Sequence, residues 1–487
     1  MTLFGRITGM MEGAGLKARA ARGGAWLGAG NGLEHALRFA RNMVLTRILA
    51  PEALGLMAII TDVNAALESF AELGVREAIV QSPAGGENTY LNSAWFLSFF
   101  RALFLVAVGV SISPAVLTFY HMDFPPLILR ISFMGILFDG LQSVKVYLAL
   151  KKMDYRKWVF IYQGAGVFGV VTTLVLVIFV RNIWALVIGF VAEAAMRCLL
   201  SYIFCPYLPR FRFNPGHTRA LKKFSLGMFG LPIFYFIFMQ ADVFVLGKLY
   251  SKTALGLYSM ASSLAQAPAL LISVFINPIM MPAFSEISGE RDRVHNVLFR
   301  VTRMICYAGF PVVLFCALFG KNILALVFGN VYGAAALPFA LILLATLLRT
   351  SSAPITTLYF ASGRPGLQRR FVIIRAALMV ALIYPLAHAF GLAGAALAGL
   401  LSMAVSYGFQ IRQMRNVNGL DVAGYFGILL RGGALSLPVL GVWALLPDVK
   451  VSLLPQLCLA AGACLIAYGL LFGLFRKSLF TRQVMAV

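Results

Sequence analysis

The sequence predicts an all-α, polytopic membrane protein of about 14 transmembrane helices. These helices are expected to form two six-helix lobes of the same orientation, followed by two C-terminal helices. Three observations lead to this fold class. The composition is too apolar for a water-soluble protein, apolar segments of bilayer-spanning length recur along the chain, and one stretch of sequence recurs 201 residues further on.

The composition points to lipid as the solvent. The 487 residues are 60% hydrophobic and only 12% charged, whereas a soluble protein carries roughly 25% charged residues. The net charge of +23 could suggest nucleic acid, but the lysines and arginines lie in short loops between apolar segments. The six cysteines fall mostly in apolar runs without a CxxC pair, which disfavours metal or redox chemistry.

Fourteen segments are long and apolar enough to span a bilayer, which takes roughly 20 residues each. The first is not expected to be a signal peptide, because it is too polar and lacks a small-residue cleavage site. The predicted spans are 25–49, 53–73, 91–113, 126–149, 157–180, 183–205, 225–249, 254–283, 297–319, 334–360, 367–388, 391–411, 424–446 and 453–475.

The distribution of basic residues predicts the topology. With a cytoplasmic N-terminus, 24 lysines and arginines fall in inside loops and 6 in outside loops, so both termini are expected in the cytoplasm. The resulting organisation has a cytoplasmic N-terminal segment, an N-lobe, a basic linker, a C-lobe, and two last spans with a cytoplasmic C-terminus. Their predicted limits are 1–24, 25–205, 206–224, 225–411 and 412–487.

The internal repeat relates the two lobes. Residues 45–57 align without a gap on residues 246–258 and share an Ala-Leu-Gly-Leu run, at 53–56 and 254–257. Six spans separate the copies, so both have the same orientation and are related by an axis along the membrane normal. Two such lobes facing a central cavity are typical of transporters. The shared run itself is expected to be structural, as a tight connection between the first two helices of each lobe.

Polar residues form one stripe, about 120° wide, on the first predicted span. We expect this stripe to line a hydrophilic cavity in which Arg38 and Arg41 bind an anion, because a guanidinium pairs with two phosphate oxygens and stays protonated. The alternative is an i,i+4 pair of Glu34 with Arg38 that only neutralises itself. His35 fits a hydrogen-bonded polar residue better than a proton carrier. The stripe consists of Asn31, Glu34, His35, Arg38, Arg41 and Asn42.

The second span carries carboxylates. Asp62 and Glu68 are expected either to balance the arginines or to bind a coupling ion, H+ or Na+, whereas Glu72 lies near the helix end, where a solvated role is the simpler interpretation. Asp242 stands at the position equivalent to Arg41 in the repeat. A salt bridge between the lobes and a protonation switch both remain open for it.

Charges elsewhere in the spans are more isolated. Among them we take Asp139 as a further counter-charge and Arg349 as a further substrate ligand. Glu193 and Arg197 form an i,i+4 pair, for which mutual neutralisation is the simpler interpretation. Walker A, GxSxG and HExxH motifs are absent from the sequence, so we expect neither an enzyme nor a bound cofactor.

Several motifs resemble the oligosaccharide and polysaccharide flippases (Wzx-like) of the MATE-like superfamily. The first span ends in an Arg-x-Leu-x-Pro-x-x-x-Gly turn at 47–55, followed by Phe-Ala-Glu-Leu-Gly at 70–74 and Ala-Ile-Val-Gln at 78–81. In the second half, an Asp-x-x-x-x-Gly run at 242–247 precedes Gly-Leu-Tyr at 256–258. Each motif alone is degenerate, and their order and spacing carry the similarity, which covers nearly the whole chain.

The resemblance implies a function. It implies a carrier in the bacterial inner membrane that moves undecaprenyl-diphosphate-linked oligosaccharide to the periplasmic leaflet by alternating access, for O-antigen, capsule or exopolysaccharide synthesis. A polysaccharide polymerase and export machinery are the expected partners, without nucleic acid.

Three alternatives stay open. A lipid II flippase would also need a cationic cavity, whereas a cation-coupled multidrug exporter would favour an acidic or aromatic one. A membrane-embedded glycan polymerase or ligase generally needs a large periplasmic loop, and the longest outside loop expected here has only about 15 residues.

Overall fold

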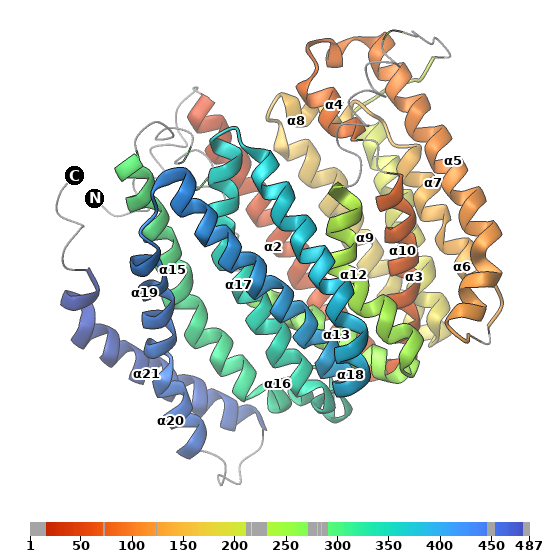
Figure 1. Ribbon diagram of the computed structural model, residues 1–487. Helices are drawn as coiled ribbons and strands as arrows, with labels where there is room; N and C mark the ends of the chain where they lie inside the picture. The colour runs from red at the N-terminus through yellow and green to blue at the C-terminus, as the bar shows by residue number, and fades with distance from the viewer. Residues whose placement is uncertain are drawn as a thin grey trace. The chain divides into compact units, whose positions relative to one another are not determined.

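In the computed structural model, the described residues are 16–71, 74–122, 124–210, 216, 231–270, 280, 284, 291–445 and 453–480, and every element among them is helical (Figure 1). The chain divides into two compact units, Met1–Gly256 and Leu257–Val487. Most of the predicted basic linker, 206–224, lies outside the described residues, and the predicted lobe boundaries stay a prediction.

The first unit is built from long helices and a few short ones. Helices α9 and α10 pack side by side, α2 packs against α9, and α3 packs against α12. The elements are α2 (Leu16–Ile48), α3 (Pro51–Phe70), α4 (Val75–Gln81), η1 (Pro83–Gly86), α5 (Asn88–Phe119), α6 (Leu127–Ser132), α7 (Met134–Gly140), α8 (Val146–Lys151), α9 (Tyr155–Val180), α10 (Ile183–Phe204), α12 (Leu231–Leu249) and α13 (Lys252–Ala265), which continues past Gly256.

The predicted fourth span, 126–149, is not one helix but the three short helices α6, α7 and α8. Side chains of α10 replace the missing helical hydrogen bonds at the break between α7 and α8. The hydroxyl of Tyr202 donates to the carbonyl oxygen of Leu141 at 2.8 Å, and the backbone N–H of Ser143 donates to Ser201 Oγ at 2.9 Å. Irregular backbone is tolerated at membrane depth only when its polar groups are satisfied inside the protein in this way.

The repeated glycines explain why the Ala-Leu-Gly-Leu run occurs twice. A Cβ atom on Gly55 would collide with the carbonyl oxygen of Lys252, and one on Gly256 would collide with that of Pro51. Pro51 and Lys252 are themselves equivalent positions of the repeat. The starts of α3 and α13 therefore cross through a reciprocal contact, which only glycine allows, since any side chain would push the two backbones apart. The run is expected to form a tight connection between the first two helices of each lobe, and the structure places its glycines at the contact between α3 and α13.

The second unit contains the remaining helices, and α17 and α18 lie side by side in it. Helix α18 contains two predicted spans, 367–388 and 391–411, and reverses direction at Gly391, whose φ of 62° and ψ of −140° lie in a region that favours glycine. The elements are α15 (Arg291–Leu318), α16 (Gly320–Phe328), η2 (Asn330–Ala335), α17 (Ala336–Ala361), α18 (Pro365–Asn418), α19 (Val422–Leu435), α20 (Leu437–Leu445) and α21 (Leu453–Phe480).

This architecture is that of a multi-pass, all-α membrane protein. Nine helices of the described part of the chain are long and apolar enough to cross a bilayer by length and composition. Large apolar side chains face outward on them, such as Phe179 at 79% and Leu430 at 74% exposure, as expected for a surface in contact with lipid. The all-α membrane fold is thus confirmed, while the count of 14 spans stays a prediction.

Candidate functional site

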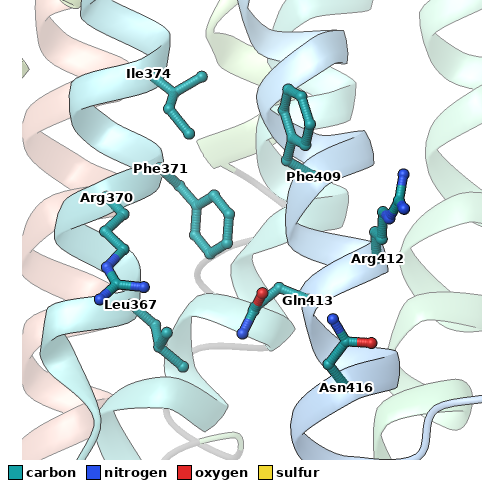
Figure 2. Close-up of a pocket in the computed structure, with 8 residues that line it drawn as sticks. All are labelled: Leu367, Arg370, Phe371, Ile374, Phe409, Arg412, Gln413 and Asn416. Atoms are coloured by element: carbon teal, nitrogen blue, oxygen red, sulfur yellow. The ribbon is translucent and has the colours of Figure 1, made fainter.

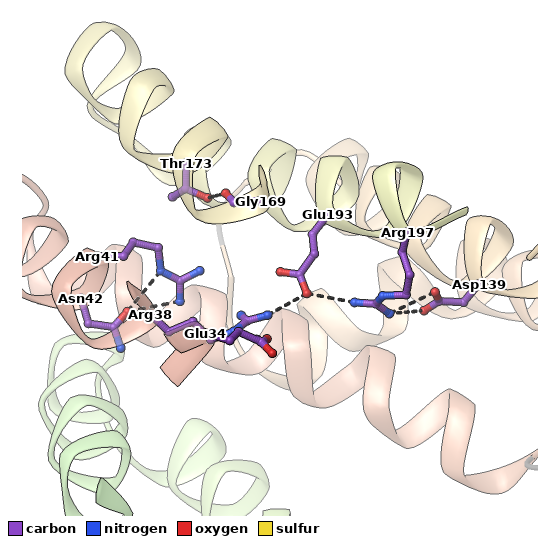
Figure 3. A network of polar contacts seen from close by, with 9 residues as sticks. All are labelled: Glu34, Arg38, Arg41, Asn42, Asp139, Gly169, Thr173, Glu193 and Arg197. Carbon is purple, nitrogen blue, oxygen red and sulfur yellow. Dashed lines mark hydrogen bonds and ion pairs between the residues drawn. The ribbon is translucent and has the colours of Figure 1, made fainter. Parts of the chain in front are cut away.

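Two residues of the polar stripe on α2, Glu34 and Arg38, belong to an ion-pair network inside the first unit (Figure 3). Arg38 Nε donates to Glu34 Oε1 at 2.9 Å, and Arg38 Nη2 donates to Glu193 Oε1 on α10 at 2.7 Å. Arg197 Nη2 donates to the same Glu193 oxygen at 2.9 Å. The i,i+4 pairs of Glu34 with Arg38 and of Glu193 with Arg197 therefore both form, but Glu193 joins them into one longer network.

The network extends from α10 to the broken fourth span. Arg197 Nη1 lies 3.1 Å from Asp139 Oδ1 and 3.3 Å from Oδ2, so the two side chains form an ion pair. The side-chain amide of Gln142, within the break, donates to Asp139 Oδ1 at 2.6 Å, and Tyr162 on α9 donates to Gln142 Oε1 at 3.2 Å. The break thus brings a carboxylate and an amide to α10.

Two glycines of α9 make room for the carboxylates. A Cβ atom on Gly166 would lie 2.9 Å from Glu34 Oε1, and one on Gly169 would lie 2.6 Å from Glu193 Cβ. Because the two glycines are three residues apart, they share one face of the helix. Small residues at a helix interface let membrane helices approach closely. Neither glycine is among the residues predicted from the sequence, although two glycines on one face of a predicted span were the available signal.

The charges of the network nearly cancel. Glu34, Arg38, Glu193, Arg197 and Asp139 alternate in sign along the chain of contacts and leave one net negative charge. A lone charge at mid-membrane costs at least roughly 2.5 kcal/mol on insertion scales. Pairing each charge with one of opposite sign reduces this cost. Each side chain in the chain of contacts is at most 30% exposed.

Arg41 differs from Arg38. Its Nε and Nη2 donate only to the side-chain oxygen of Asn42, at 3.3 and 3.2 Å, and it forms no ion pair within the described ranges. A guanidinium has five N–H donors, so Arg41 retains donors for a ligand, while Arg38 already pairs with two carboxylates. In Figure 3, Arg41 and Asn42 lie apart from the Glu193–Arg197–Asp139 end.

The remaining predicted residues occupy different environments. Asn31 accepts a hydrogen bond from Gln163 Nε2 on α9 at 2.6 Å, and His35 is exposed. Glu68 is half-buried on α3, and Arg349 is half-buried on α17 of the second unit. Glu72 lies outside the described residues. All of these assignments stay predictions.

A second polar centre in the first unit contains Asp62. Asp62 is 3% exposed and its carboxyl group accepts a hydrogen bond from the side-chain amide of Gln240 on α12, while Oδ2 has no hydrogen-bond partner among the described residues. Asp242 lies two residues from Gln240 on the same helix and is half-buried. A buried carboxyl oxygen without a hydrogen-bond partner among the described residues is suited to hold a proton or a cation.

The fold and the charged network define the class of protein. It is a multi-pass membrane protein in which ion-paired side chains lie between the packed helices. Residues 44–337, more than half of the chain, match the polysaccharide biosynthesis protein family, and the protein belongs to this family.

Individual relatives extend the similarity over most of the chain. The chain is 24% identical over 380 residues to an uncharacterised membrane protein in the cps region of Klebsiella pneumoniae, which covers 76% of this chain and 77% of that protein. It is 21% identical over 442 residues, 88% of this chain and 85% of the other, to the lipopolysaccharide biosynthesis protein WzxC of Escherichia coli (strain K12).

A solved structure shares the fold. The lipid II flippase MurJ in an inward closed conformation matches with a TM-score of 0.75 and 13% identity, over 91% of this chain and 98% of that one. At this level of identity the similarity concerns the fold alone.

Proposed function

We propose that this protein is a flippase that moves undecaprenyl-diphosphate-linked oligosaccharide from the cytoplasmic to the periplasmic leaflet of the bacterial inner membrane. It would act by alternating access and supply surface polysaccharide synthesis. Membership of the polysaccharide biosynthesis protein family and similarity to a lipopolysaccharide biosynthesis protein support this proposal. The structural observation that carries it is Arg41, an arginine of α2, the helix that contains the first predicted span, which forms no ion pair among the described residues.

The chemistry of the substrate fits that arginine. A diphosphate head group carries negative charge and several acceptor oxygens, and Arg binds such groups through two parallel N–H···O bonds. Arg38, which two carboxylates hold in place, would position the adjoining part of α2 and not bind the head group itself. The lipid tail would stay in the bilayer.

The excess of lysine and arginine in one set of loops supports an orientation with both termini in the cytoplasm. A polysaccharide polymerase and export machinery would then act on the product on the periplasmic side. Transport needs no catalytic residue in this protein, because no covalent bond of the substrate changes.

A deletion strain tests the function. Deleting the gene is expected to abolish surface polysaccharide and to leave the lipid-linked oligosaccharide in the cytoplasmic leaflet, where an impermeant glycan-oxidising reagent does not reach it. Lipid extraction and carbohydrate analysis measure both effects. Normal polysaccharide after deletion would contradict the proposal, as would rescue of a lipid II flippase mutant, or drug sensitivity as the sole defect.

The centre at Asp62 supports coupling of transport to H+ or Na+. Asp62→Asn mimics the neutral carboxyl group, so the rate in proteoliposomes is expected to fall to the rate seen without an ion gradient. The measurement compares flipping with and without an imposed proton or sodium gradient. Glu52→Gln is the matched control, since Glu52 is an exposed carboxylate at the start of the same helix, and it should keep the gradient response. A full gradient response in Asp62→Asn would remove Asp62 from coupling.

A further inference from the structure

The reversal of α18 at Gly391 creates a small cleft in the second unit. It has a volume of about 290 Å³ and lies between the first and last turns of the helix (Figure 2). Because the two halves run in opposite directions, residues near 370 and near 412 come to the same end of the unit. Arg370 and Arg412 line the cleft from the two halves, and both are exposed.

The end of α18 that contains the cleft is strongly basic. Three further exposed arginines, Arg364, Arg369 and Arg415, belong to the same end of α18. Neither Arg370 nor Arg412 forms an ion pair within the described part of the chain. Two unpaired guanidiniums at one opening favour an anion with several acceptor oxygens.

The interior of the cleft combines amides with apolar side chains. Figure 2 shows Phe371 and Leu367 on one half facing Gln413 on the other, with Asn416 one turn further along. The amide groups can donate to ester or phosphate oxygens, and the apolar groups exclude water from them. Such a mixture suits an amphipathic ligand and does not suit a fully hydrated ion.

An apolar stripe leads from the cleft along the second half of α18 toward Gly391. Phe409, Val405 and Leu401 are 48%, 41% and 38% exposed, and they are spaced four residues apart along the second half of α18. Residues at this spacing share one helix face. The ligand site therefore continues into an outward apolar surface, where an acyl chain can lie.

Contacts behind the cleft hold the two helix halves in place. Gln410 Nε2 donates to Gln368 Oε1 at 3.1 Å, and Ser406 Oγ donates to the carbonyl oxygen of Phe371 at 3.2 Å. These contacts join the two halves, so the cleft is formed before any ligand binds. A preformed site avoids the entropic cost of ordering it on binding.

We propose that this cleft binds the head group of an anionic phospholipid of the surrounding bilayer, with its phosphate between Arg370 and Arg412 and an acyl chain along Phe409. Basic pockets between membrane helices on the cytoplasmic side bind such head groups, and the positive-inside orientation puts this end of α18 on that side. The lipid is a component of the membrane and not the transported substrate, so the proposal does not depend on the transport function.

Lipid add-back to the delipidated, detergent-purified protein tests the proposal. Native mass spectrometry is expected to show binding of one dioleoyl phosphatidylglycerol, and Arg370→Gln/Arg412→Gln should weaken it roughly tenfold or more. Arg364→Gln/Arg415→Gln is the matched control. It removes the same charge from the same end of α18 outside the cleft and should change binding less than about twofold.

Each other outcome would overturn the proposal. Equal losses of phosphatidylglycerol affinity in the two double variants would mean that the overall positive charge attracts the lipid and that the cleft is not a specific site. Equal binding of dioleoyl phosphatidylcholine would exclude recognition of an anionic lipid. Competition of phosphatidylglycerol by millimolar inorganic phosphate would assign the cleft to a free anion. As a check on folding, Phe409→Ser should also weaken phosphatidylglycerol binding, while the thermal midpoint of all variants stays near that of the unchanged protein.

Discussion

Replacing Arg41 with alanine is expected to reduce flipping by about 100-fold, while the protein stays folded and reaches the membrane in normal amounts. Two charge-assisted hydrogen bonds to a phosphate, each at the lower end of the roughly 1.5–3 kcal/mol that such bonds contribute, account for a loss of this size. Folding should be unaffected, because Arg41 bonds only to the side chain of Asn42 among the described residues. Surface polysaccharide in a complemented deletion strain, normalised to protein in the membrane, measures the effect.

Two further variants make the Arg41 experiment specific. Arg41→Lys keeps the charge but lacks the planar fork of donors, so it should restore only part of the activity. Arg101→Ala is the matched control, since Arg101 is a membrane arginine of the same unit that donates to the backbone carbonyl of Ala71 at 3.2 Å, away from α2. Near-normal export in Arg41→Ala, or an equal loss in Arg101→Ala, would show that Arg41 does not bind the substrate.

The second large effect concerns stability. Glu193→Ala is expected to lower the free energy of unfolding by roughly 3–5 kcal/mol, because Arg38 and Arg197 each lose a charge-assisted hydrogen bond worth roughly 1.5–3 kcal/mol. Arg38 keeps Glu34 and Arg197 keeps Asp139, but the two guanidiniums then face each other without the carboxylate between them. A fall in the thermal midpoint of the purified protein, with less protein in the membrane, measures this effect.

A surface ion pair provides the comparison for Glu193. Glu77 pairs with Arg76 at 2.6 Å, but the Arg76 side chain is 53% exposed. Glu77→Ala should therefore cost less than about 1 kcal/mol. Equal effects of the two substitutions would mean that Glu193 does not hold the network together. Glu193→Gln should fall between them, since it keeps the shape and one acceptor but loses the charge.

The two experiments distinguish roles that the sequence alone combined. Arg38 and Arg41 lie on the same stripe and were predicted as equal anion ligands. The structure places Arg38 between Glu34 and Glu193, so its loss should resemble Glu193→Ala in lowering stability, whereas loss of Arg41 should act on transport. Glu34 precedes Arg38 by one helical turn and could be paired from spacing, but Glu193 is 155 residues away and could not.

The broken fourth span illustrates the same limit. Its apolar composition predicts a helix over 126–149, because hydropathy reports the solvent and not the continuity of the backbone. The break depends on Tyr202 and Ser201 of α10, which satisfy backbone groups near Leu141 and Ser143. These side-chain hydrogen bonds, which replace the missing helical ones, form only when the helices have packed against each other.

Composition, hydropathy and the order of motifs along the chain indicate the lipid solvent, the helical class, the internal repeat and the family. Each of these follows from local composition or from order along the chain, which folding does not change. Only the folded chain shows which charges neutralise one another, what Gly55 and Gly256 contact, and that Arg370 and Arg412 line one cleft. These depend on contacts between residues that are distant in sequence, and in a membrane the position of a charge relative to its partner decides whether that charge is structural or available to a ligand.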